Sequence, residues 1–82
     1  MANIGTYHLN TNGYETLESL IGETFTEDTT YYCQVLGGTF FVREGENGDG
    51  FLVRYPEKFS FTQGDDDFYV KSVGHSTINI AD

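Results

Sequence analysis

The 82-residue chain contains a single cysteine, a single proline, no tryptophan and only four basic residues. Because one thiol, Cys33, cannot form an internal disulfide, the sequence excludes a small secreted scaffold held together by disulfides. No segment approaches the roughly 20 consecutive apolar residues of a membrane-spanning helix, and residues 1–4 do not combine a basic region with an apolar run. We therefore expect no signal peptide, no membrane association, and folding in a reducing cytosol.

The shortage of basic residues leaves a strongly acidic chain. Thirteen acidic residues face four basic ones, Arg43, Arg54, Lys58 and Lys71, and the formal charge is −9 at pH 7. Because nucleic-acid binding depends on Lys and Arg neutralising phosphates, this balance argues against direct binding of DNA or RNA. The acidity has several open meanings: solubility, a basic protein partner, a divalent cation, or imitation of a polyanion.

Aromatic residues and glycines are abundant, and both favour strands joined by tight turns. Seven Phe and six Tyr supply large flat side chains that suit a pleated sheet, and ten Gly suit turns. The second half contains short β-patterned segments separated by Gly, Pro or Asp, at residues 51–55, 58–62, 67–73 and 76–80. This spacing predicts a single all-β domain over residues 1–82, a small antiparallel sandwich or barrel-like fold of about six to eight short strands.

The first half of the chain adds a hairpin and a short helical turn to this prediction. Residues 29–36 and 39–43 are rich in β-branched and aromatic residues, and Gly37-Gly38 between them is typical of a two-residue hairpin turn. Residues 14–21 carry apolar side chains at helical spacing, although a strand fits there nearly as well. Residues 1–22 either pack on the sandwich or form an N-terminal arm or edge segment that reaches a neighbouring copy.

Alternation along the later strands assigns their faces. Successive side chains of a strand point to opposite faces, so residues two apart share a face. The apolar members predict a core that contains Phe51, Val53, Phe59, Phe61, Ile78 and Ile80. Between residues 67 and 73 both faces carry apolar groups, which predicts a strand that is central in the sheet or covered by a neighbouring subunit.

Candidate catalytic residues are few. Cys33 with His8 or His75 has the residue types of a thiolate nucleophile and its base. Cys33 lies within an apolar strand, however, where a buried thiol behaves as a small hydrophobic group. The sequence therefore predicts a protein that is not an enzyme, with no catalytic residues and no cofactor.

A group of carboxylates is the remaining candidate for metal binding. The oxygen donors are Asp65, Asp66 and Asp67, joined by Glu44, Glu46 or Asp49 from the preceding loop. Ca²⁺ takes six to eight such oxygens, but three consecutive carboxylates without a calcium-loop pattern are more typical of a solvated turn. We therefore predict no metal site, and acidic loops at residues 44–50 and 64–67 that keep the domain soluble.

The run of residues 24–82 resembles small structural proteins of tailed bacteriophage particles in several segments. They are a Tyr-rich strand ending in Gln-Val-Leu-Gly, a Gly-Phe-Leu-Val segment, a strand of the form Asp-Phe-Tyr-Val-Lys-Ser and a closing Ile-Asn-Ile-Ala-Asp, at residues 31–37, 50–53, 67–72 and 78–82. The resemblance implies a virion component made in the host cytoplasm, such as a capsid decoration, head-fibre or tail-accessory subunit. It also implies contacts with other virion proteins and with further copies of the same chain, commonly in a homo-oligomer.

A structural role of this kind predicts docking through an apolar patch, with the acidic side chains spread outward. The residues that we expect to bind partners are Tyr69, Val73, Tyr31 and Tyr55.

Two other classes of function remain open. An acidic phage-encoded inhibitor would occupy the basic nucleic-acid channel of a host protein, and its carboxylates would gather on one surface. A glycan-binding adhesion module would instead expose coplanar tyrosines, for which the sequence offers Tyr31, Tyr32, Tyr55 and Tyr69.

Overall fold

The computed structural model describes residues 3–45 and 50–82, so residues 46–49 of the predicted exposed loop lie outside the described residues. The strands are β1 (Asn3–Leu9), β2 (Glu15–Thr16), β3 (Thr30–Glu44), β4 (Phe51–Arg54), β5 (Lys58–Thr62) and β6 (Phe68–Ala81), and the helix α1 (Leu17–Ile21) follows β2. All six strands belong to one antiparallel sheet. The predicted all-β fold with a short helical turn within residues 14–21 is therefore confirmed.

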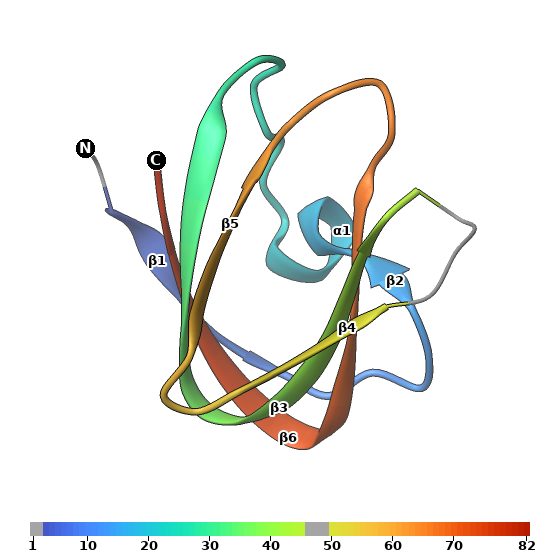
Figure 1. Ribbon diagram of the computed structural model, residues 1–82, viewed down its shortest axis with the longest axis vertical. Coiled ribbons are helices and arrows are strands. Elements are labelled where there is room, and N and C mark those ends of the chain that lie inside the picture. Colours follow the sequence, from blue (N-terminus) through green and yellow to red (C-terminus); the bar gives the residue numbers. More distant parts are fainter. Residues whose placement is uncertain (1–2, 46–49) are drawn as a thin grey trace.

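The sheet is folded in two across its long central strands. β3 and β6 pair with each other along most of their length. β1 and β2 pair in succession with β6, and β4 and β5 pair in succession with β3. Figure 1 shows β3 and β6 turning back on themselves, so that the two parts of the sheet face each other.

We refer to these two parts by name. Half-sheet A consists of residues 3–9, 30–35, 58–62 and 76–81. Half-sheet B consists of residues 15–16, 39–44, 51–54 and 68–73. The two-layer arrangement expected of a small sandwich is thus made by a single sheet, whose long strands belong to both layers.

Glycines and one serine make the bend possible. Gly38 and Gly74 have φ angles of 79° and 67°, in the left-handed region that other residues enter only at a cost. A β-carbon on Gly38 would lie 2.8 Å from the β-carbon of Ser76. The Ser76 hydroxyl accepts a hydrogen bond from the Thr39 N–H at 3.2 Å and donates one to the Thr39 carbonyl at 3.1 Å. Ser76 therefore satisfies backbone groups that the bend removes from the regular ladder.

The predicted hairpin turn at Gly37-Gly38 is wrong, because both flanking segments belong to β3 and pair with β6. The register shifts between Val35 and Gly37 and again between Gly37 and Thr39. β3 buries alternate residues up to Val35 and again from Phe40. The irregularity thus changes the phase of alternation, so that both parts of β3 turn an apolar side to the core. In the same way, the strands predicted at residues 67–73 and 76–80 are one continuous strand, β6.

The core lies between the two half-sheets. Its buried members are Leu9, Leu17, Phe25, Tyr31, Cys33, Val35, Phe40, Val42, Phe61, Phe68, Val70, Ile78 and Ile80. Phe68 of half-sheet B stacks on Phe61 of half-sheet A, with 4.1 Å between ring centroids. This contact links the two layers near the ends of the strands that lie furthest from the bend.

Half of the predicted core residues are buried, two are partly buried, and one is clearly exposed. Phe61, Ile78 and Ile80 are buried, and Val53 and Phe59 pack against the core while partly exposed. Phe51 is 73% exposed, so its assignment to the core is wrong. It lies on the same side of β4 as Val53, but β4 is at the edge of the sheet and the space beside it is open. β6 lies between β3 and the β1 and β2 strands, so the predicted central position of residues 67–73 is confirmed.

The N-terminal segment from Asn3 onward packs on the domain rather than reaching away from it. β1 pairs with β6, and Leu17 of α1 is fully buried. α1 ends at Gly22, whose N–H donates to the Glu18 carbonyl at 2.9 Å. The Glu18 carboxylate then accepts a hydrogen bond from the Phe25 N–H at 2.7 Å. This contact fixes the loop after α1 so that the Phe25 ring enters the core.

Candidate functional site

Charge is distributed unevenly along the folded sheet. Among the described residues, Glu57 is the one carboxylate at the bend; the others lie in β2 and α1 or in strand ends and loops away from it. These are Glu15, Glu18, Glu23, Glu27, Asp28, Glu44, Asp65, Asp66, Asp67 and Asp82. Arg54 and Lys58 flank the bend, at the end of β4 and the start of β5. The bend, with two cations and one carboxylate, is therefore weakly basic, and the opposite end, which we call the open end, is acidic.

The outer face of half-sheet B combines apolar and basic side chains. The strand register places Val73 and Arg54 level with each other across β3, on one face of the sheet. It likewise places Lys71, Phe41 and Leu52 side by side on that face. Val73 is 55% exposed and Leu52 is 51% exposed. We call Phe41, Leu52 and Val73 the outer patch. Exposed apolar side chains of this size on neighbouring strands mark a surface suited to contact with another protein.

Aromatic rings contact two of the cations of this face, Arg43 and Lys71. The guanidinium carbon of Arg43 lies 4.0 Å from the ring centroid of Tyr14 and 5.6 Å from that of Tyr69. The Lys71 ammonium lies 5.1 Å from the Tyr14 centroid and 4.8 Å from that of Phe41. Each such contact contributes about 0.5–1 kcal/mol at partly exposed sites. Sequence pattern does not predict this role of Tyr14, because it depends on the fold bringing Arg43 of β3 and Lys71 of β6 to the Tyr14 ring.

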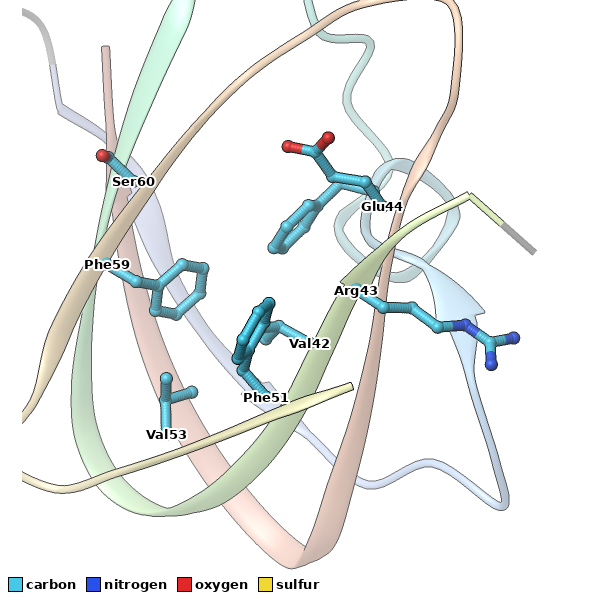
Figure 2. Close-up of a pocket in the computed structure, with 8 residues that line it drawn as sticks. Val42, Arg43, Glu44, Phe51, Val53, Phe59 and Ser60 are labelled. Carbon is cyan, nitrogen blue, oxygen red and sulfur yellow. The ribbon is translucent and has the colours of Figure 1, made fainter. Parts of the chain in front are cut away.

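A cleft of about 610 Å³ opens between β4 and β5, where the two half-sheets meet solvent. Its lining residues are Val42, Arg43, Glu44, Phe51, Val53, Phe59, Ser60 and Phe68. Figure 2 shows Phe51, Val53 and Phe59 pointing into this space, while the Arg43 side chain points away from it. Phe59 stacks on Phe68 with 5.8 Å between centroids. We call this feature the β4–β5 cleft; its walls are mainly apolar, and the Glu44 carboxylate lies at its rim.

The predicted partner-binding residues do not form one surface. Val73 is exposed and Tyr69 partly exposed, and both lie on the outer face of β6 as predicted. Tyr55 is 61% exposed beside the bend, where its N–H donates to the Gly38 carbonyl at 3.1 Å.

The assignment of Tyr31 to a binding surface is wrong, because the side chain is only 3% exposed. Its ring packs against Phe25 with 4.5 Å between centroids, and its hydroxyl accepts a hydrogen bond from the Thr26 N–H at 2.6 Å. Tyr31 lies two residues before Cys33 in β3, so both side chains point to the core-facing side of the strand.

Cys33 is unsuited to act as a nucleophile. The side chain is buried, and burial raises the pKa of its thiol from 9.0 to about 12, so the thiol is protonated near neutral pH. His8 is exposed, and its Nδ1 lies 2.9 Å from the Thr77 hydroxyl. Cys33 faces the core while His8 and His75 are both exposed, so the structure does not form either candidate pair of nucleophile and base.

The described residues contain no group of three or more His, Cys, Asp or Glu side chains placed to hold a metal ion. Glu46 and Asp49, named as possible calcium ligands, lie outside the described residues. α1 has five residues, and no helix within the described ranges is long and apolar enough to cross a bilayer.

No protein-family model matches the chain, and comparison with curated proteins and with solved structures found no match. The features of the molecule that bear on its function are therefore the outer patch, the β4–β5 cleft and the uneven distribution of charge between the bend and the open end.

Proposed function

We propose that this chain is a non-enzymatic structural subunit of a bacteriophage particle, an accessory or decoration protein of the capsid or tail. It is made in the host cytoplasm and acts in the virion through contacts with other virion proteins and with copies of itself. The observation that carries this proposal is the outer patch, where Leu52 of β4 and Val73 of β6 are more than half exposed on the same face of half-sheet B, on either side of β3. The resemblance of residues 24–82 to small virion proteins suggests the assembly in which such a patch would bind, the phage particle.

The size of the domain gives docking an energetic advantage. A domain of about this length buries only about 60% of its unfolded surface, so its stability alone is small. Covering Leu52 and Val73 removes apolar area from water, and full burial of such a side chain contributes about 1.5–3 kcal/mol. A partner surface therefore stabilises the fold as well as the assembly.

Particle association tests this proposal. The chain is expressed with an affinity tag in the infected host, and its recovery is followed through density-gradient purification of the particles. We expect the wild-type chain to band with the particles. Leu52→Glu and Val73→Glu place a charge in the contact and should reduce recovery at least about tenfold.

Tyr32→Glu is the matched control, because Tyr32 is, like Leu52 and Val73, a large exposed hydrophobic side chain but lies on the outer face of half-sheet A. Its recovery should equal that of the wild type, and circular dichroism should show that all variants are folded. Wild-type chain that stays out of the particle band would contradict the proposal, as would equal loss of all three variants.

A second candidate is an acidic inhibitor that occupies a basic channel of a host protein. It is favoured by the gathering of carboxylates at the open end, where Asp65, Asp66 and Asp67 follow one another between β5 and β6. This function predicts a complex with a basic host protein that dissociates as salt rises. Changing the three aspartates to asparagine should abolish that complex while leaving particle recovery unchanged.

A glycan-binding role has less support. Of the tyrosines available for a sugar platform, Tyr31 is buried, Tyr32 lies on half-sheet A, and Tyr55 lies at the bend. Tyr69 is partly covered on the outer face of half-sheet B. These side chains do not share one face, so they do not make the coplanar surface that a sugar ring needs.

A further inference from the structure

The β4–β5 cleft presents a large aromatic side chain that the fold leaves uncovered. Phe51 is 73% exposed although it lies on the core-facing side of β4. The cleft beside it, about 610 Å³, is in the size range of specific binding sites. Its floor is continuous with the core, because Phe68 in the cleft stacks on the buried Phe61 at 4.1 Å. An apolar group placed there would extend the core rather than rest on the surface.

The rim of the cleft toward the open end is acidic. Glu44 lines the cleft directly. The next residue, Gly45, donates its N–H to the Asp67 carbonyl at 2.8 Å, and a β-carbon on Gly45 would lie 3.5 Å from the carboxyl carbon of Asp66. Asp66 therefore lies beside Gly45, one residue along the chain from Glu44. Arg43 does not neutralise these carboxylates, because its guanidinium lies over the Tyr14 ring and points away from the cleft.

The bend of the same molecule carries a side chain of complementary chemistry. Among the described residues, Tyr55 is the exposed large apolar side chain with basic residues close on both sides in the chain, Arg54 and Lys58. The turn that presents it is well fixed. The Arg54 N–H donates to the Glu57 carboxylate at 3.0 Å, and the Glu57 N–H donates to the Arg54 carbonyl at 2.7 Å. Tyr55 is thus displayed on an ordered turn.

We infer that the cleft and the bend bind each other between two copies of the chain. Tyr55 of each copy enters the β4–β5 cleft of the other, and Arg54 and Lys58 face the acidic rim formed by Glu44 and Asp66. The inference rests on the proposed structural role and specifies its self-contact. Its apolar part is distinct from the outer patch, because Phe51 and Leu52 lie on opposite faces of β4, while Arg54 lies at the end of β4 on the same face as Leu52.

The direction of β4 selects the symmetry of this contact. β4 begins near the acidic open end and finishes at the basic bend, from Phe51 to Arg54. Two such edges placed antiparallel about a two-fold axis bring each acidic rim beside the partner's basic bend, whereas a parallel placement brings like charges together. Strand addition along β4 contributes little, since both backbone groups of Arg54 are already bonded to Glu57. Recognition is therefore by side chains and charge.

Charge exchange between two variants tests this inference. Light scattering behind size-exclusion chromatography should give the wild type a mass of twice the 9.2 kDa chain. Arg54→Glu/Lys58→Glu should weaken the dimer at least about tenfold, because both contacts become repulsive. Glu44→Lys/Asp66→Lys should do the same. An equimolar mixture of these two double variants restores opposite charges at both contacts, so it should form a dimer with near wild-type affinity.

Net charge provides a matched control. Each Glu→Lys or Asp→Lys change adds two charges, so Glu44→Lys/Asp66→Lys brings the formal charge from −9 to −5. Electrostatic repulsion between two copies of this variant is therefore weaker than between two wild-type copies. If the variant loses the dimer, the loss cannot be caused by greater overall repulsion. Glu27→Lys/Asp28→Lys makes the same change of net charge in the loop before β3, so it should keep the dimer intact.

Restored dimerisation in the mixture is a result that misfolded variants cannot give. A wild-type monomer at about 1 mM, a larger closed oligomer, or double variants that remain dimeric would each overturn the inference. The proposed function is judged separately by recovery with particles, which depends on Leu52 and Val73. A chain that bands with particles but stays monomeric in solution would thus reject the cleft contact alone.

Discussion

At the scale of single residues, the bend depends on positions where a side chain has no room. Gly38 combines a left-handed backbone with close approach to Ser76, whereas a β-carbon on the adjacent Gly37 would have no heavy atom within 4 Å. The same two-residue sequence therefore contains one position that requires glycine and one that tolerates alanine. Local sequence gives no signal of this difference, because the atoms that close around Gly38 come from β6.

Alanine at these two positions should have different effects on stability. Gly38→Ala should lower the free energy of unfolding by about 2–3 kcal/mol, since it adds the cost of a left-handed non-glycine residue to displacement of Ser76. Gly37→Ala should change it by less than about 0.5 kcal/mol. Urea unfolding followed by tyrosine fluorescence measures both. Equal destabilisation by the two substitutions would contradict the role assigned to Gly38.

The buried thiol of Cys33 predicts a dependence of stability on pH. Burial raises its pKa from 9.0 to about 12 in the folded protein, so above pH 9 the unfolded chain releases a proton that the folded chain retains. The contribution of the buried Cys33 thiol to the free energy of unfolding is complete below pH 9 and is lost as the pH rises from 9 toward 12. The Cys33→Ala variant has no thiol, so its free energy of unfolding does not fall for this reason. The gap in unfolding free energy between wild type and Cys33→Ala should therefore narrow above pH 9, and a constant gap would argue against burial as the cause.

At the scale of elements, the short strands and the helical turn could be predicted from local pattern, while the two long strands could not. Residues 58–62 form β5 as predicted, and β4 differs from its predicted range at one end only. β3 and β6 each contain a glycine at the bend that is locally indistinguishable from a hairpin turn. The outcome is decided by long-range pairing between β3 and β6, which alternation within one segment cannot reveal.

The loop after α1 acts as a structural element of the core. The Phe25 ring lies 4.5 Å from the Tyr31 centroid and 5.3 Å from that of Phe61. Phe25→Ala should lower the free energy of unfolding by about 3 kcal/mol, because it leaves a cavity among aromatic rings. Thr24→Ala, at an exposed neighbouring position, should have almost no effect. Denaturation of both variants by urea makes the comparison, and a small effect at Phe25 would show that the loop is not part of the core.

At the scale of the whole molecule, folding one sheet in two separates the charges. The connections away from the bend carry most of the described carboxylates, while the bend carries Arg54 and Lys58. Net charge of −9 was evident from composition, but this polarity was not, because it depends on which strand ends lie together. The same folding leaves the β4–β5 cleft open to solvent. This candidate binding site is therefore produced by the topology of the sheet rather than by any sequence motif.

Phe51 distinguishes stability of the monomer from assembly of the dimer. Because Phe51 is 73% exposed, Phe51→Ala should change the unfolding free energy at low protein concentration by less than about 0.5 kcal/mol. In the proposed dimer the ring is covered by Tyr55 of the second copy, so the same substitution should raise the dissociation constant at least about tenfold. Sedimentation equilibrium measures the association, with Tyr32→Ala as the control on half-sheet A. A monomer destabilised by several kcal/mol with unchanged association would assign Phe51 to the core after all, as the alternation of β4 first predicted.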